Sequence, residues 1–255
     1  MDRRAIAAVV APFLCLAALN AHAQGGAGVG VDPALVKIGF FYGGRKVTVR
    51  ADMPFFDDAV ILVTGQRKDL TLQKKGKRAG VLWMNVGEVE YKDVPAIFII
   101  RSSRPLDKIA SPEELKRLGL GYDALEDQVT TGADQHARDL YPELIKLKEK
   151  EKLFSVRDDG VPVGPIVSPR LDLAYFFLPP KAPRGEYQVK VFAFNDGKGV
   201  LAGEGELTLQ FSSGVQFIYD MAKNRGLLYG VLAAAIAIVA GLATGFIFGG
   251  KGETH

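Results

Sequence analysis

Between two hydrophobic ends, the chain is filled by short segments in which apolar residues alternate with polar ones or run on without interruption. Bounded by Gly, Pro, Asn and Asp, such segments predict β-strands. We expect strands at Val36–Tyr42, Arg45–Asp52, Ala59–Gly65, Asp69–Lys75, Val81–Val86, Ala96–Ser102, Leu171–Leu178, Glu186–Asn195 and Leu201–Phe211. Gly43-Gly44 and Asp196–Gly199 are hairpin signals between neighbouring strands. The pattern predicts a mainly β fold, an antiparallel β-sandwich of immunoglobulin-like type.

A helical insertion at about 111–153 interrupts this strand pattern. Ser111-Pro112-Glu113-Glu114 combines an N-cap serine, a proline at the first helical position and an early glutamate, so it opens a short helix to Leu118. A longer helix is expected over Asp134–Leu153, with Leu140, Leu144 and Leu147 on its apolar face. Its alternating lysines and glutamates are typical of a solvated helix face.

The C-terminal hydrophobic segment predicts a membrane span, because Leu227–Phe248 contains no Asp, Glu, Lys, Arg or His. About 22 residues at 1.5 Å each reach roughly 33 Å, enough to cross the hydrocarbon core of a bilayer. We expect Ser213–Gly226 to begin the same helix outside the bilayer.

Small residues recur at every fourth position of this helix, which would let another helix approach closely. The positions are Ala233, Ala237, Gly241, Gly245 and Gly249. The alternative explanation is composition alone, because alanine and glycine are common in membrane helices. The partner across this face would be a second copy or another integral membrane protein.

The N-terminal segment resembles an export signal rather than a span. A basic start at Arg3 and Arg4 precedes an apolar run from Ala5 to Leu19 and the small-x-small sequence Ala21-His22-Ala23. That run is short for a membrane span, so cleavage after Ala23 is expected.

These two ends give the expected organisation and location. They predict a signal peptide at 1–23, a flexible lead-in at 24–31, an exported domain at 32–212, a juxtamembrane and transmembrane helix at 213–249 and a cytoplasmic tail at 250–255. The protein would be a single-pass component of the bacterial inner membrane, with its domain in the periplasm. The few charges that flank the span weakly oppose this orientation, so it rests on the export signal.

Composition and charge exclude several classes of function. Removing Asp2, Arg3 and Arg4 changes 32 Lys+Arg and 29 Asp+Glu to 30 and 28, a net charge of +2 that predicts no nucleic-acid partner. Cleavage also removes Cys15, so the mature chain could hold no disulfide or thiolate metal site.

Candidate chemistry in the exported domain is sparse. His136 is its only histidine, and the sequence gives it no nucleophile or base as a neighbour. The acidic turns at Asp57-Asp58, Asp158-Asp159 and Asp196 do not match the spacing of a calcium loop. We therefore expect no enzymatic activity, no catalytic or metal site and no cofactor.

The stretch QRKDLTLQKKGKRAG is the strongest candidate for a binding surface. We interpret it as part of a hairpin whose basic residues would attract a small anion, acidic lipid or an acidic partner. These residues are Arg67, Lys68, Lys74, Lys75, Lys77 and Arg78. The alternative is protection of an edge hairpin against aggregation, for which lysines are commonly used.

The run from Phe41 to Leu106 resembles an uncharacterised family of alphaproteobacterial-type transmembrane proteins. The similarity lies in K-K-G-K-R followed by G-V-L-W-M-N, in S-S-R-P-L, in the late P-R-G-E-Y-Q-V-K-V-F-A-F and in the single C-terminal span. The resemblance implies an exported domain with no assigned activity. It also implies an association with permeases of the sulfite or organosulfonate exporter type, or with redox proteins.

Two hypotheses on function follow. The first is a non-enzymatic accessory subunit that docks on a multi-span permease or a membrane redox complex. The second is a self-associating envelope or anion-binding module, in which the same glycine face makes a homodimer.

Overall fold

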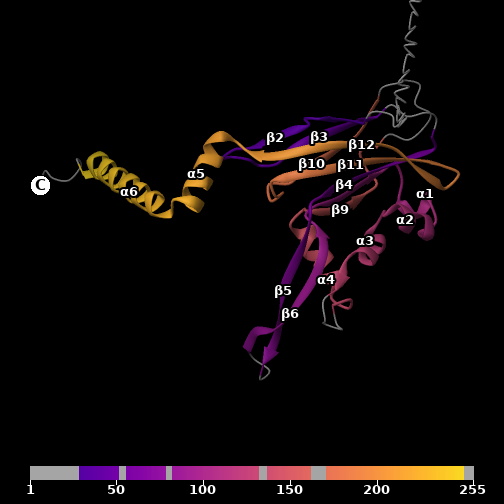
Figure 1. Ribbon diagram of the computed structural model, residues 1–255, viewed down its shortest axis with the longest axis horizontal. Coiled ribbons are helices and arrows are strands. Elements are labelled where there is room, and N and C mark those ends of the chain that lie inside the picture. The colour runs from indigo at the N-terminus through magenta and orange to yellow at the C-terminus, as the bar shows by residue number, and fades with distance from the viewer. Residues whose placement is uncertain (1–28, 52–55, 79–81, 132–136, 162–170, 250–255) are drawn as a thin grey trace, which may run out of the picture.

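The computed structural model of the protein describes residues 29–51, 56–78, 82–131, 137–161 and 171–249, and the strands in these ranges form three sheets (Figure 1). The first sheet has the order β1 (Val29–Asp32), β3 (Arg45–Ala51) and β10 (Leu171–Leu178). The second has the order β2 (Leu35–Ile38), β12 (Lys198–Phe211), β11 (Gly185–Asn195), β4 (Asp58–Gly65), β7 (Phe98–Ser102) and β9 (Phe154–Arg157). The third joins β5 (Arg67–Arg78), β6 (Leu82–Pro95) and the short β8 (Thr130–Thr131).

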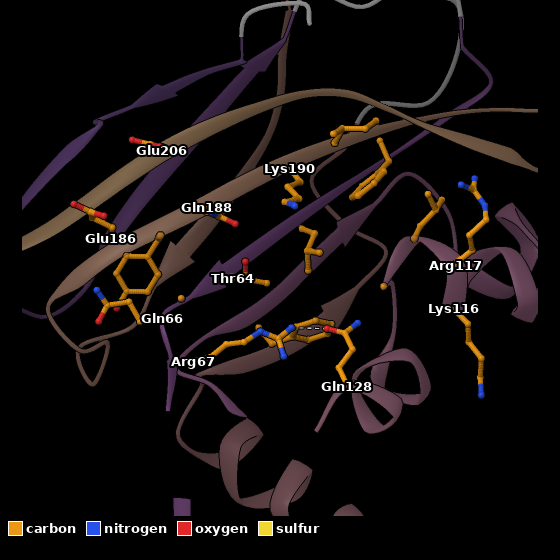
Figure 2. Close-up of a pocket in the computed structure, with 18 residues that line it drawn as sticks. Thr64, Gln66, Arg67, Lys116, Arg117, Gln128, Glu186, Gln188, Lys190 and Glu206 are labelled. Carbon is orange, nitrogen blue, oxygen red and sulfur yellow. Dashed lines mark hydrogen bonds between the residues drawn. The ribbon is translucent and has the colours of Figure 1, made fainter. Parts of the chain in front are cut away.

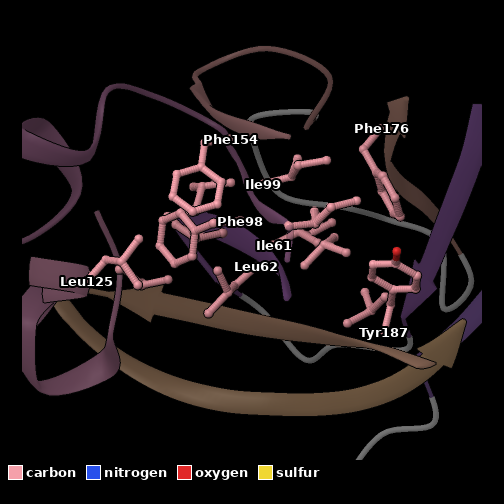
Figure 3. Close-up of a cluster of buried hydrophobic side chains, with 14 of the residues drawn as sticks. Ile61, Leu62, Phe98, Ile99, Leu125, Phe154, Phe176 and Tyr187 are labelled. Carbon is pink, nitrogen blue, oxygen red and sulfur yellow. The ribbon is translucent and has the colours of Figure 1, made fainter. Parts of the chain in front are cut away.

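The first core layer lies between the three-stranded sheet β1-β3-β10 and the six-stranded sheet. Alternate residues of each strand point inward, so β3 contributes Val47 and Val49, and β10 contributes Phe176. Figure 3 shows Phe176 close to Ile61 of β4 and Tyr187 of β11. All five side chains are at most 2% exposed.

The second core layer covers the opposite face of the six-stranded sheet with helices. These are α1 (Leu106–Ile109), α2 (Pro112–Leu118), α3 (Tyr122–Gln128) and α4 (Tyr141–Lys150). Phe98 of β7 and Phe154 of β9 place their ring centroids 5.9 Å apart, and the Tyr122 ring lies 6.1 Å from that of Phe98. Leu62 and Leu125 complete this cluster (Figure 3). Because β4 is buried on both faces, its sequence is a continuous apolar run.

The prediction of a mainly β fold is confirmed, but the immunoglobulin-like arrangement is not. Two strand pairs are parallel, β2 with β12 and β9 with β7, and both lie at the edges of the six-stranded sheet. The predicted hairpin through Gly43-Gly44 is wrong, since β2 and β3 belong to different sheets. Gly44 has φ +103°, and a Cβ there would stand 2.3 Å from the Phe177 ring, so the glycine lets the loop before β3 pack closely against β10.

The predicted turns and helices are confirmed in part. Asp196 and Gly197 have positive φ and join β11 to β12 as expected. Ser111 caps α2 by accepting from the N–H of Glu114 at 3.3 Å. The expected helix over 134–153 is wrong in extent: residues 137–140 form turns and α4 occupies Tyr141–Lys150, while residues 134–136 lie outside the described ranges. The helix α3 in the same insertion was not expected.

At the N-terminal end, Val29, Gly30 and Val31 pair with β3 as part of β1, which corrects the expected flexible lead-in over that part. The signal peptide, the rest of the lead-in and the C-terminal tail lie outside the described residues.

Two helices follow the last strand. These are α5 (Ser213–Asn224) and α6 (Gly226–Gly249), separated only by Arg225, whose φ and ψ are −138° and 52°. The single helix expected here is therefore two, and Figure 1 shows a sharp bend between them.

Candidate functional site

The hairpin of β5 and β6, called the arm here, projects from the body of the domain (Figure 1). Its base is packed: Val89 and Tyr91 are buried, and the Tyr91 hydroxyl donates to the carbonyl of Ala137 at 2.8 Å. Beyond the pair Leu72 and Val89, the described side chains of the arm are exposed. The outer half of the arm is therefore a two-stranded ribbon without a packed face among its described side chains.

The structure divides the predicted basic cluster into two groups. Arg67 lies at the base of the arm, where it donates to the carbonyl of Asp93 at 3.1 Å and to the side chain of Gln128, and Lys68 follows it. Lys74 and Lys75 lie on the outer half and are exposed. Lys75 is eight positions along the strand from Arg67, so at about 3.3 Å per residue these two residues are roughly 26 Å apart. Lys77 and Arg78 continue β5 toward the tip, and their side chains are outside the described set.

A groove of about 730 Å³ crosses the face of the six-stranded sheet beside α2 and α3 (Figure 2). One row of polar residues runs across three strands on the floor of the groove. In this row Gln188 of β11 is paired with Glu206 of β12 on one side and with Thr64 of β4 on the other. The next row places Lys190 beside Leu62, with its ammonium group 3.3 Å from Glu204.

The ends of two helices make the other side of the groove. Lys116 and Arg117 come from the last turn of α2, and Gln128 is the last residue of α3 (Figure 2). The guanidinium of Arg67 bonds to Gln128 and closes the groove on the side of the arm. With amides and charges of both signs, this arrangement suits hydrogen bonding to a polar segment rather than selection of one charge.

The described residues include no histidine and no cysteine, since His22, His136, His255 and Cys15 all fall outside them. Within the same ranges there is no group of acidic, His or Cys side chains that could hold a metal ion. In the groove, Thr64 and Tyr187 carry the hydroxyls, and Tyr187 donates its own to the carbonyl of Pro183.

A second cavity, of about 450 Å³, surrounds a buried arginine. Arg101 interrupts the apolar strand β7, with a side chain that is 11% exposed. It donates to Ser155 Oγ at 3.1 Å, and its Nε lies 3.4 Å from Asp159. Arg157 contacts the other oxygen of Asp159 at 2.9 Å, and Lys152 also lines the cavity. Burial lowers the pKa of Arg101 and Asp159 opposes this effect, so a guanidinium remains charged there at neutral pH.

The helix α6 carries the small residues that the sequence singles out. Ala233, Ala237, Gly241 and Gly245 are exposed, and Gly249 ends the helix. At about 100° per residue, each four-residue step turns 40°, so the five positions wind through roughly 160° of the helix surface. Ala237, Gly241 and Gly245 span about half of that arc, so these three form the part of the stripe that one straight helix could contact.

The groove and the Arg101 cavity were not identified from the sequence, although both left signals there. In E-Y-Q-V-K-V, the apolar positions of β11 predict one buried face, and Glu186, Gln188 and Lys190 define the other. Arg101 is the single charge in F-I-I-R-S. Neither signal says that helices would be packed beside these side chains.

Among the described residues, a β-rich domain is followed by one helix that is long and apolar enough to cross a membrane, which is the arrangement of membrane-anchored proteins. The candidate span, Gly226–Phe246, buries none of its residues in the domain. The chain belongs to the family described as "Putative transmembrane protein (Alph_Pro_TM)", whose model matches residues 28–249. This confirms the resemblance found in the sequence. No curated protein and no solved structure matches the chain significantly.

Proposed function

We propose that the protein is a non-enzymatic interaction subunit of the bacterial inner membrane, which docks through its periplasmic domain on a multi-span permease or a membrane redox complex. The observation that carries this proposal is the arm. Its outer half adds no described side chain to the core, yet it extends the domain with exposed polar groups such as Gln73, Lys74 and Lys75. An isolated two-stranded ribbon is only marginally stable, so the outer half of the arm does little to stabilise the fold. Contact with a partner would explain why the domain carries this extension.

The helix α6 supports a partner inside the membrane. Its described residues are exposed, including Ala237, Gly241 and Gly245, which would let a second helix come close. Arm and span together would contact a partner both above and within the bilayer. Self-association through the same glycines is the competing arrangement.

The test is affinity purification of the tagged full-length chain in mild detergent, followed by mass spectrometry. A multi-span membrane protein recovered in near-stoichiometric amount is the expected result. Lys74→Glu with Lys75→Glu should weaken this recovery, whereas Lys108→Glu with Lys150→Glu, an equal charge change at exposed sites on α1 and α4, should not.

A matched pair of variants tests the membrane helix. Gly241→Leu with Gly245→Leu fills the proposed contact face, and Ala240→Leu with Ala243→Leu places two leucines about 100° and 160° around the helix from Gly241. Loss of the partner in the first variant alone supports docking through α6. A chain that purifies alone, or that loses only a dimer, contradicts the accessory-subunit proposal in favour of self-association.

The Arg101 cavity favours a second candidate function, the binding of a small oxyanion. Arg101, Arg157 and Lys152 line it together with one acidic residue, Glu149. Asp159 pairs with both arginines. Calorimetric titration of the full-length protein with sulfate or phosphate should then detect binding that Arg157→Gln removes. Arg138→Gln, at an exposed site between β8 and α4, is the control and should bind normally.

A further inference from the structure

The helix α5 has three distinct faces. At 100° per residue, Gln216, Asp220 and Lys223 fall on one arc together with Ser213 and Asn224, and the apolar residues fill the rest. One apolar side contacts the domain through Tyr219. The Tyr219 ring centroid lies 5.4 Å from that of Phe211 in β12, and the Arg184 guanidinium lies 4.6 Å from the Tyr219 ring centroid. The third face carries Phe217 and Ile218, which are 64% and 38% exposed.

An aromatic loop lies beside this third face. The loop 39–44 between β2 and β3 meets the start of α5, where the N–H of Ser212 donates to the carbonyl of Ile38 at 2.8 Å. The Phe40 ring packs over Gly214, 3.3 Å from the place of a Cβ. Phe41 is fully exposed at the tip of the loop. On the helix, Gly214 lies between Phe217 and Ile218, so the loop extends the same apolar surface.

The path of the chain keeps this surface at the bilayer. Arg225 alone separates α5 from α6, and the two helices meet at a sharp bend (Figure 1). If α6 crosses the bilayer, α5 must run along its surface rather than rise from it. All of α5 then lies at the interface, together with the loop that contacts its first turn.

The charges at this end of the domain match a lipid surface. Among residues 37–45, 179–186 and 213–225, the basic side chains are Lys37, Arg45, Lys181, Arg184, Lys223 and Arg225, and the acidic ones are Glu186 and Asp220. Lys181 also pairs with Glu151, at 3.2 Å, so five of the six basic groups account for the excess. Asp220 also accepts from Gln216 at 2.8 Å. An apolar strip flanked by excess positive charge is the pattern of segments that lie in the headgroup region of anionic membranes.

From this arrangement, we propose that α5 and the loop 39–44 form a lipid-binding surface that seats the domain directly on the bilayer. Phe40, Phe41, Phe217 and Ile218 enter the interface, and the surrounding lysines and arginines contact the phosphates. This goes beyond the proposed docking on a partner, because it concerns the lipid and fixes how the domain stands on the membrane.

Quenching of tryptophan fluorescence by brominated lipid tests the proposal. The chain has one tryptophan, Trp83 in the arm, so the background is full-length Trp83→Phe reconstituted in vesicles of phosphatidylcholine and phosphatidylglycerol. Phe41→Trp and Phe217→Trp place the probe in the proposed surface. Val200→Trp is the control: this residue is 61% exposed at the start of β12, about 36 Å along the strand from Phe211.

Bromine placed near the top of the acyl chains should reduce the emission of the probes at 41 and 217 about twofold or more and leave the probe at 200 unchanged. Quenching at 217 without quenching at 41 would overturn the proposal, because α5 alone would then touch lipid. A blue-shifted but unquenched probe at 41 would overturn it as well, since a second copy of the chain would then cover the loop.

Discussion

Arg104 closes over Asp58 where β7 ends and β4 begins. Its Nε donates to Oδ1 at 2.8 Å, and a second guanidinium nitrogen donates to Oδ2. The Ser103 hydroxyl donates to the same Oδ1 at 2.6 Å. Asp58 is 2% exposed, so protein donors replace nearly all of its water. The hydrogen bonds from Arg104 hold the pKa of Asp58 below its ordinary value, although burial acts to raise it.

Removing this carboxylate should therefore destabilise the domain. Asp58→Ala leaves the donors around it without an acceptor, which costs about 2 kcal/mol. For a chain of this size, the melting temperature in detergent should fall by roughly 4–8 °C. Asp158→Ala, at an exposed site, is the control and should melt like the wild type. Equal melting of both variants would show that the cluster adds no stability.

Glu114 should make stability depend on pH in the acid range. Its Oε1 accepts from Arg117 at 2.6 Å and from the N–H of Gly199 at 2.9 Å, which lowers its pKa to about 2. The unfolded value is about 4.3, so the stabilising contribution is complete above that pH and is lost as pH falls toward 2.

Melting curves of wild type and Glu114→Gln should therefore differ at pH 7 and converge near pH 2. Glu143→Gln removes an exposed pair with Lys146 on α4 and should have little effect. A gap between wild type and Glu114→Gln that is constant over this range would contradict the assignment.

Gly199 lies where β12 packs against α2. A Cβ there would stand 2.5 Å from Leu118 Cδ1 and 2.6 Å from the Phe194 ring. Gly199→Ala should cost about 1–3 kcal/mol by overpacking. Gly87→Ala adds the same methyl group in the arm, where nothing lies within 4 Å, and should be close to neutral. Thermal unfolding of the two variants measures the difference.

Shortening the arm should leave the fold intact. Gln73 and Glu88 are direct partners, so an Asn-Gly turn can replace residues 74–87 between them. Since the packed base ends at Leu72 and Val89, stability should change by no more than about 0.5 kcal/mol. A fall of several degrees in melting temperature would show that the outer half packs on the body. Retained stability with lost partner recovery would separate binding from folding.

The alternation of apolar and polar residues, together with the turn-forming residues between segments, predicted most of the long strands. The remaining strands depend on packing between distant parts of the chain. β4, β10, β11 and β12 begin and end within a few residues of their expected positions, because alternation or continuous apolar character is strong there. β9 was missed because it is short and pairs in parallel with β7. A parallel pair has no hairpin turn between its strands that could be recognised in the sequence. The strands β2 and β3 were expected as one hairpin, because Gly43-Gly44 predicts a reversal of the chain. A turn signal does not specify which sheet the next strand joins.

The candidate sites were predicted less completely than the fold. Spacing placed the basic residues on a hairpin but could not show that Arg67 is bound at its base while Lys75 lies far out on the arm. The break at Arg225 was also missed, since the sequence stays apolar from Gly226 onward and gives only a glycine as a cue.

The six-stranded sheet ends on both sides in a strand of four residues, β2 and β9. A protein held in a membrane meets its own copies at high lateral density, where long open strands invite pairing between neighbours. Edges this short offer too few free backbone groups for a stable intermolecular ladder. The sheet can therefore crowd beside other copies without polymerising, and contact between chains is left to other surfaces.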